Sequence, residues 1–166
     1  MGRIVIVCGS PADRPHADAI VKAALELGIE ASVRIASAHR TPEHALAILR
    51  DAEAATEPTV LVTVAGRSNA LSGFADPQVS VPVIACPPPS DQTHLDVWSS
   101  LRMPAGVAPV VVLEPANAAL AAAKMLGLVD PAIRQSVRSY QSAQRERVTN
   151  ADAEVTNSTK DAHARS

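Results

Sequence analysis

The stretch ASVRIASAHRTPEHALAILRDAEAA, residues 31–55, decides the fold of this chain. It opens with a short run, Ala31–Ile35, that is typical of a strand in a parallel sheet. It closes with a run from Glu43 to Ala55 whose apolar residues recur at helical spacing. Between the two, Thr41 can cap the helix and Pro42 suits its first position. A strand, a polar turn and a helix in this order predict one unit of an alternating α/β fold.

The same alternation continues along the chain. The strand candidates are short, β-branched and bounded by turns, as strands covered on both faces should be: Ile4–Cys8, Ala31–Ile35, Val60–Val64, Val81–Ala85 and Val110–Leu113. The helix candidates show apolar faces formed by Ala17, Ile20, Val21, Ala24 and Leu25 before Gly28, by Ala45, Ile48, Leu49 and Ala52, and by the alanine-rich run 116–126. The sequence therefore predicts a three-layer α/β/α domain of flavodoxin-like type, with a parallel five-stranded sheet and an extra C-terminal helix.

The end of the chain follows the last strand and has no sheet position to lead to. A helix from Pro131 to about Val148 places Ile133, Val137 and Tyr140 on one stripe, which can pack on a neighbouring subunit. From Thr149 onward the chain is polar and lacks periodicity. We therefore expect a catalytic domain over residues 1–148 and a disordered C-terminal tail over residues 149–166.

Composition narrows the classes of function. Apolar residues make up 47% of the 166 residues, which is enough for a single core, whereas aromatic residues make up only 2% and leave few rings to stack on bases or flavins. A formal net charge of −2 gives no reason to expect nucleic acid or a membrane as partner. Cys8 and Cys86 lie in or beside apolar runs and are interpreted as buried thiols. Without a signal peptide or a long apolar run, a cytoplasmic protein is expected.

Polar side chains follow three of the predicted strands. Gly9 and Ser10 open the first turn, where glycine lets a ligand approach the backbone and the next helix directs N–H groups at an anion. Asp13 can either cap that helix or hold a sugar hydroxyl. His39 and Arg40 follow the second strand and offer a proton carrier and an anion clamp. The carboxyl ends of parallel strands are where ligands bind in such sheets.

The third turn adds Gly66, Arg67, Ser68 and Asn69, whose backbone and side-chain donors can bind a carboxylate or an oxyanion. Asn69 as a simple helix cap, with Arg67 in solvent, is the alternative. The loop Cys86–Asp91 is rich in proline and can form a pocket wall. No cluster of residues has metal-ligand spacing, and no nucleophile elbow is present. This inventory favours proton transfer on a phosphorylated small molecule without a cofactor.

The chain resembles the PurE family of purine biosynthesis over roughly residues 3 to 148. The resemblance is carried by the segments GSPAD (9–13), SAHRTP (37–42), AGRSNALSG (65–73), CPP (86–88) and DVWSSLRMP (96–104). In the mutase branch of the family the third turn reads GGAAHLPG, and its histidine falls at Ala70 here. The third turn and the DVWSSLR segment instead resemble the carboxylase branch, class II, closely.

The resemblance implies ATP-independent, reversible carboxylation of 5-aminoimidazole ribonucleotide by CO2, giving 4-carboxy-5-aminoimidazole ribonucleotide. It implies His39 as the catalytic acid and base, with the substrate bound by Ser10, Asp13, Ser37, Arg40, Gly66, Arg67, Ser68 and Asn69. It further implies a homo-oligomer, a tetramer or an octamer, and neither metal nor cofactor.

Two residues depart from the carboxylase pattern. Ala12 stands where the family usually has a second serine, so backbone donors must do more of the phosphate binding. Arg40 stands where carboxylases often have lysine, which is the choice of the mutase branch. The N5-carboxyaminoimidazole ribonucleotide mutase is therefore the nearest alternative, and a flavodoxin-like nucleotide- or flavin-binding module is a more remote one.

Overall fold

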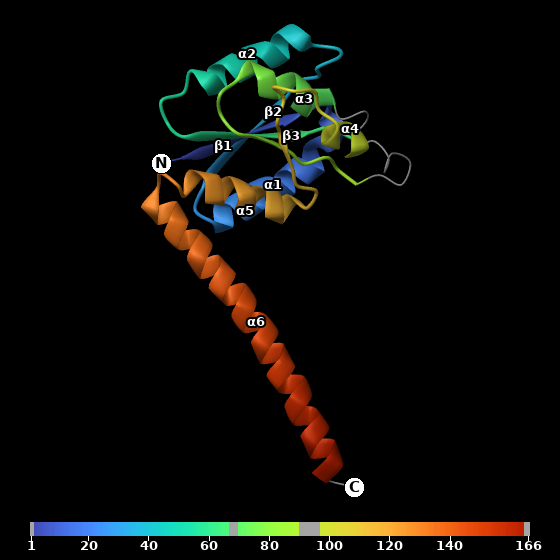
Figure 1. Ribbon diagram of the computed structural model, residues 1–166, viewed down its shortest axis with the longest axis vertical. Coiled ribbons are helices and arrows are strands. Elements are labelled where there is room, and N and C mark those ends of the chain that lie inside the picture. Colours follow the sequence, from blue (N-terminus) through green and yellow to red (C-terminus); the bar gives the residue numbers. More distant parts are fainter. Residues whose placement is uncertain (1, 67–69, 90–96, 165–166) are drawn as a thin grey trace.

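The computed structural model describes residues 2–66, 70–89 and 97–164, and it confirms the three-layer α/β/α fold (Figure 1). The strands are β1 Arg3–Cys8, β2 Glu30–Ile35, β3 Thr59–Val64, β4 Val83–Ala85 and β5 Val110–Val111. The helices are α1 Arg14–Glu26, α2 Pro42–Glu53, α3 Ala70–Ala75, α4 Val97–Leu101, α5 Pro115–Leu126 and α6 Pro131–Ala164, with short 3-10 turns at Pro11–Asp13 and Asp76–Gln78.

The five strands form one parallel sheet in the order β2-β1-β3-β4-β5. β1 lies between β2 and β3, and its Ile4 pairs with Ala31 of β2 on one side and Val60 of β3 on the other. Because all strands run the same way, the turns after β1, β2 and β3 meet at one edge of the sheet.

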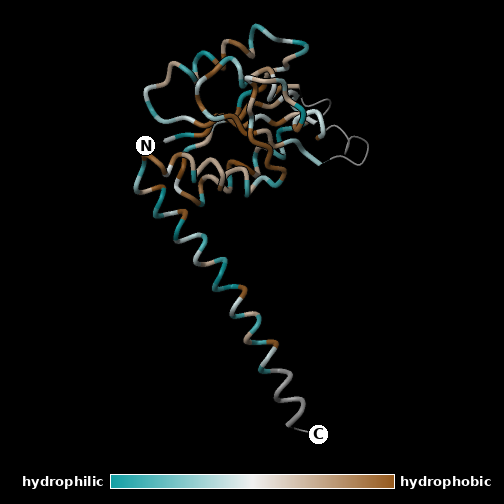
Figure 2. The backbone as a smooth tube through the Cα atoms, in the orientation of Figure 1, coloured by the Kyte–Doolittle hydropathy of each residue, from teal (hydrophilic) through white to brown (hydrophobic). Residues whose placement is uncertain are grey.

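Each face of the sheet has its own core, because successive side chains of a strand point to opposite faces. Ile4 and Ile6 pack beneath α1 and α5, while Val5 and Val7 pack beneath α2 and α3. Figure 1 shows α2 and α3 on one side of the sheet and α1 and α5 on the other. Figure 2 shows the hydrophobic residues concentrated in the sheet and on the helix faces that cover it.

The alanine-rich helix α5 packs closely on α1 of the same chain. Its buried residues are Ala118, Ala119, Ala122, Ala123 and Leu126. Small side chains on both helices let them approach one another and the sheet. At the amino edge of the sheet the contact is also tight, since a Cβ atom on Gly2 would lie 2.8 Å from Cδ2 of Leu126.

The edges of the elements differ from the sequence prediction for local reasons. β4 begins at Val83 rather than Val81, because Pro82 has no N–H for the ladder. β5 ends at Val111 rather than Leu113, although Val112 still donates its N–H to the Ala85 carbonyl at 2.9 Å. Leu25 was expected on the buried face of α1 but is 62% exposed. The buried residues of α1 are Ala17, Ile20 and Ala24, a narrower face than the set of apolar residues in the sequence predicts.

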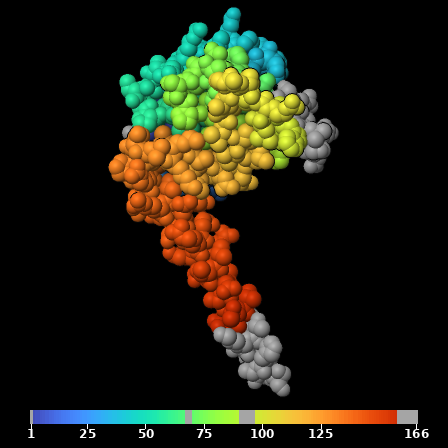
Figure 3. Space-filling view, in the orientation of Figure 1, coloured from blue at the N-terminus to red at the C-terminus, as the bar shows by residue number. Residues whose placement is uncertain are grey.

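The chain after residue 148, which the sequence predicts to be a tail without structure, continues helix α6. Helix α6 continues for 34 residues to Ala164, and residues 148–157 are exposed (Figures 1 and 3). Neither glycine nor proline follows Pro131, so nothing in the backbone ends the helix. Only its first turns pack on the domain, where Ile133 and Val137 are buried and Tyr140 is partly buried against the core. The division into a domain of residues 1–148 and a separate tail remains a prediction.

Candidate active site

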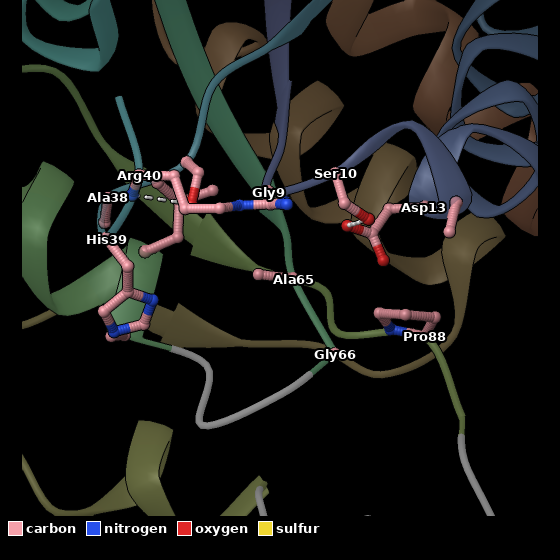
Figure 4. Close-up of a pocket in the computed structure, with 13 residues that line it drawn as sticks. Gly9, Ser10, Asp13, Ala38, His39, Arg40, Ala65, Gly66 and Pro88 are labelled. Atoms are coloured by element: carbon pink, nitrogen blue, oxygen red, sulfur yellow. Dashed lines mark hydrogen bonds between the residues drawn. The ribbon is translucent and has the colours of Figure 1, made fainter. Parts of the chain in front are cut away.

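A cavity of about 590 Å³ opens where the turns after β1, β2 and β3 meet (Figure 4). It is lined by residues of four segments: Gly9, Ser10, Ala12 and Asp13; Ser37, Ala38, His39 and Arg40; Ala65, Gly66, Ala70 and Leu71; and Pro88. The structure thus brings together six of the nine site residues expected from the sequence, namely Ser10, Asp13, Ser37, His39, Arg40 and Gly66. The other three, Arg67, Ser68 and Asn69, lie outside the described residues.

The turn after β1 lies close to the end of β3. The N–H group of Gly9 donates to the Val64 carbonyl at 2.8 Å, and a Cβ atom on Gly9 would meet Cβ of Ala65 at 3.1 Å. A larger residue at this position would push the two strand ends apart. Glycine at this position lets the ends of β1 and β3 stay close together and leaves the Gly9 backbone accessible to a ligand.

Ser10 and Asp13 are joined on the rim of the cavity. Oγ of Ser10 donates to Oδ2 of Asp13 at 2.9 Å, and the N–H of Asp13 donates to the Ser10 carbonyl at 3.2 Å. Asp13 precedes α1, but its side chain makes no capping hydrogen bond. Asp13 thus stands at the N-cap position without capping α1 through its side chain, and its carboxylate lies beside the cavity, where it can accept from a ligand hydroxyl (Figure 4).

Ser37 holds the turn after β2 in shape. Its carbonyl accepts from the N–H of Thr41 at 2.9 Å, and its N–H donates to Oγ1 of Thr41 at 2.9 Å. Its hydroxyl oxygen accepts from the N–H of Arg40 at 3.2 Å. Thr41 thus bonds back to Ser37 instead of capping α2 with its side chain, contrary to the sequence prediction, whereas Pro42 does occupy the first helical position. A hydroxyl that accepts one hydrogen bond can still donate its own proton to an anion.

His39 and Arg40 stand exposed on the cavity rim, on the side away from Ser10 and Asp13 (Figure 4). The Arg40 side chain is drawn reaching toward Gly9, and the His39 ring lies lower, across from Pro88. An exposed imidazole keeps both nitrogens available to exchange a proton. The Arg40 guanidinium supplies positive charge to a site that otherwise holds the Asp13 carboxylate.

Gly66 and Pro88 form the opposite wall. A Cβ atom on Gly66 would lie 3.5 Å from Cγ of Pro88, an ordinary contact distance, so the third turn and the proline loop touch here. This confirms the prediction that the proline-rich loop forms a pocket wall, as far as its described residues go. Ala70 begins α3 and lines the cavity with a small side chain.

The two cysteines are buried free thiols, as predicted. Burial raises the pKa of Cys8 to about 11 and that of Cys86 to about 12, so neither is a nucleophile at neutral pH. Among the described residues no group of His, Cys, Asp and Glu side chains could hold a metal ion. None of the helices in the described ranges is long and apolar enough to cross a membrane.

Sequence reasoning missed several residues around the site. Ala38, Ala65 and Leu71 line the cavity with apolar surface; they lie within the segments 37–42 and 65–73, but none of them was assigned a role from the sequence. His16, to which no role was assigned from the sequence, lies with Nε2 3.4 Å from Sγ of Cys86. The two residues are 70 positions apart, so no local pattern could have revealed the contact.

Known proteins resemble this chain over nearly its whole length. The family model described as AIR carboxylase matches residues 3–147. A phosphoribosylaminoimidazole carboxylase of Treponema denticola is 46% identical over 92% of this chain and 96% of its own, and one of Archaeoglobus fulgidus is 49% identical over 92% of this chain and 84% of its own. The crystal structure of Treponema denticola PurE superposes with a TM-score of 0.90 at 45% identity, covering 93% of this chain and 98% of that one. The family model covers most of the chain, and these relatives are more than 40% identical to it over nine tenths of its length. The chain therefore belongs to the AIR carboxylase family.

Proposed function

We propose that this protein carboxylates 5-aminoimidazole ribonucleotide with CO2, reversibly and without ATP, in the de novo synthesis of purines. The observation that carries the proposal is the single cavity in which His39 and Arg40 face Ser10 and Asp13, in a member of this family. A proton carrier, an anion clamp and a sugar acceptor are what a carboxylation of a ribonucleotide requires. The names of the relatives from Treponema denticola and Archaeoglobus fulgidus, both phosphoribosylaminoimidazole carboxylases, support the same reaction.

The polar groups of the cavity suit the two ends of a ribonucleotide. Ser10, Ser37 and Arg40 are assigned to the 5′-phosphate, since hydroxyl and guanidinium donors suit a dianion. Asp13 is assigned to the ribose, because a carboxylate accepts from hydroxyl groups and repels phosphate. When the ribose satisfies Asp13, the Ser10 hydroxyl is released from its 2.9 Å bond and can turn to the phosphate.

The chemistry is carbon–carbon bond formation followed by loss of a proton. The exocyclic amine of aminoimidazole ribonucleotide makes ring carbon C4 nucleophilic, and C4 attacks the carbon of CO2. The adduct then carries an extra proton at C4. His39 removes that proton and restores the aromatic ring, and it returns the proton in the reverse direction.

The third turn, Gly66 to Asn69, is assigned to binding CO2 and the carboxylate that forms from it on the substrate. Gly66 lies at the cavity wall, and Arg67, Ser68 and Asn69 follow it in the sequence. Backbone and side-chain donors in such a turn stabilise negative charge as it develops on the CO2 oxygens. The binding site holds the two reactants in line, and this positioning supplies much of the rate of a reaction with a weak electrophile.

The assembly and the location are further parts of the proposal. Large apolar side chains are exposed on the described surface, among them Trp98, Leu101, Leu113, Leu128 and Val129. Exposed apolar side chains of this size suit burial between copies of the chain, and we propose a homo-oligomer, a tetramer or an octamer, in the cytoplasm. Light scattering of the purified protein would give its mass in solution.

The test of the function is an assay of the purified protein with 5-aminoimidazole ribonucleotide and bicarbonate, without ATP. Formation of 4-carboxy-5-aminoimidazole ribonucleotide, followed by its ultraviolet absorbance, is expected. Requirement for ATP, or absence of product at saturating CO2, would contradict the proposal.

A further inference from the structure

A buried thiol and an imidazole are in contact on two segments that lead into the cavity. Sγ of Cys86 lies 3.4 Å from Nε2 of His16 and 3.6 Å from the carbonyl oxygen of Leu113. Cys86 is fully buried and His16 is partly buried. These separations are hydrogen-bond distances for sulfur, so three segments of the chain meet at this one thiol.

The direction of the hydrogen bonds follows from the chemistry of the thiol. A thiol has one proton, and here it is donated to the Leu113 carbonyl. In the tautomer that carries the ring proton on Nε2, His16 donates to the sulfur, and the imidazole also hydrogen-bonds to the backbone of Cys86. This chain of bonds runs from α1 through the end of β4 to the segment just before α5.

The Cys86 thiol and the His16 imidazole are both neutral, so they are not the thiolate–imidazolium pair of a cysteine nucleophile. Burial raises the pKa of Cys86 to about 12, and burial also lowers the pKa of His16. The charged groups that face His16 are Glu114 and Asp13, which oppose the lowering of its pKa without reversing it. A thiolate–imidazolium pair would need the opposite shifts, so the contact is a link between elements.

The link connects two segments that line the cavity. His16 lies in the first turn of α1, three positions after Asp13, and Cys86 lies two positions before Pro88. Asp13 and Pro88 both line the cavity, and Figure 4 shows them at the same end of it, one above the other. Fixing His16 to Cys86 therefore fixes the gap between the turn after β1 and the proline wall.

We propose that His16 is a positioning residue: its hydrogen bond to Cys86 holds Asp13 and Pro88 at the separation that a ribonucleotide requires. This inference rests on the proposed function for its ligand. It predicts an effect on binding rather than on proton transfer, because His39 lies on the other side of the cavity and is not part of the link.

The experiment measures the affinity for 5-aminoimidazole ribonucleotide by calorimetry in a set of matched variants. His16→Gln can keep an N–H donor near the position of Nε2, whereas His16→Asn is too short to reach the sulfur. Cys86→Ser keeps a hydroxyl in place of the thiol, and Cys86→Ala removes it. His44→Asn is the control, since His44 is exposed on α2 and does not line the cavity.

The expected result is a dissociation constant raised about tenfold in His16→Asn and Cys86→Ala, the size of one lost hydrogen bond with some loss of geometry. His16→Gln, Cys86→Ser and the control should stay within about threefold of the unchanged protein. Turnover at saturating ribonucleotide should change little in all of them, as expected for lost ground-state binding. The double variant His16→Asn with Cys86→Ala should be no worse than either single variant, because both break the same link.

Equal affinity in His16→Asn and the unchanged protein would overturn the inference, and so would equal losses in His16→Asn and His16→Gln. A melting temperature measured for every variant separates a lost link from a lost fold: if His16→Asn unfolds, the comparison of Cys86→Ser with Cys86→Ala decides. If the unchanged protein does not bind the ribonucleotide, the proposed function itself fails, which is a different result from binding that is insensitive to His16.

Discussion

Oγ of Ser10 lies 2.9 Å from Oδ2 of Asp13, and the hydroxyl donates its proton to the carboxylate on the rim of the cavity. The pair ties the turn after β1 to the start of α1. It also places a negative charge next to the donors assigned to a phosphate. In the proposed function the two residues bind different parts of the ligand, Ser10 the phosphate and Asp13 the ribose, so their effects can be separated by experiment.

Asp13→Asn should weaken binding of 5-aminoimidazole ribonucleotide about 10-fold, because hydrogen bonds to a charged group contribute roughly 1.5–3 kcal/mol and the amide retains part of that. Inorganic phosphate should bind as well as before or better, since the repelling carboxylate is gone. Calorimetry with both ligands checks this. Equal weakening for the two ligands would show that Asp13 supports the fold of the turn and does not bind the ribose.

His39→Asn should reduce turnover by about 10²–10⁴-fold, the usual contribution of a general acid or base, and leave the ribonucleotide affinity nearly intact. The reason is that asparagine keeps a polar side chain on the same turn but cannot carry the proton from C4. Steady-state kinetics and calorimetry give the two quantities. His44→Asn, on an exposed face of α2, is the matched control. Near-normal turnover in the His39 variant would remove His39 from the mechanism.

Arg40→Ala should weaken binding of the ribonucleotide far more than binding of the nucleoside without phosphate. A charge-assisted contact contributes roughly 1.5–3 kcal/mol, or about 10- to 150-fold in affinity. The control is Arg50→Ala, since Arg50 is exposed in the last turn of α2, away from the cavity. If both ligands lose the same affinity, Arg40 does not contact the phosphate.

The branch of the family can be tested with labelled CO2. A carboxylase admits CO2 from solution, whereas a mutase releases it from the N5-carbamate and recaptures it inside a closed site. We expect label in the medium to enter the product, because Ala70 stands where the mutase branch has its histidine. Efficient conversion of the carbamate with no label incorporated would assign the protein to the mutase branch.

Removal of residues 149–166 should leave the melting temperature of the domain almost unchanged. Residues 148–157 are exposed in α6, and surface changes of this kind usually alter the free energy of unfolding by less than about 0.5 kcal/mol. Calorimetry of the full and shortened chains makes the comparison. A fall of many degrees would mean that the distal half of α6 is part of the folding unit, and the division at residue 148 would then be wrong.

The central strands of the sheet could be predicted from the sequence because they are apolar along most of their length. All six residues of β3, Thr59–Val64, are buried, and such a run permits few alternatives. The edge strand β5 was harder to predict from the sequence. β5 has only two residues, and Val110 is 44% exposed, so its sequence carries little of the signal that marks β3.

The place of the site followed from the sheet, whereas its hydrogen bonds did not. Parallel strands bring their carboxyl ends together, which is why His39, Ser10 and Gly66 could be expected in one cavity. Thr41 and Asp13 both have side chains able to cap a helix, and the sequence does not reveal that each finds a serine instead. The choice depends on the exact path of each turn.

Helix α6 starts beside the amino edge of the sheet, where Leu126 at the end of α5 meets Gly2, and it points away from the domain (Figure 1). The cavity lies at the carboxyl edge, so the two are at opposite ends of the strands. At about 1.5 Å per residue, a helix of 34 residues reaches about 50 Å. A fluorophore or a surface tether attached to its far end would therefore sit well clear of the chemistry, and an immobilised enzyme would present its open cavity to the solution.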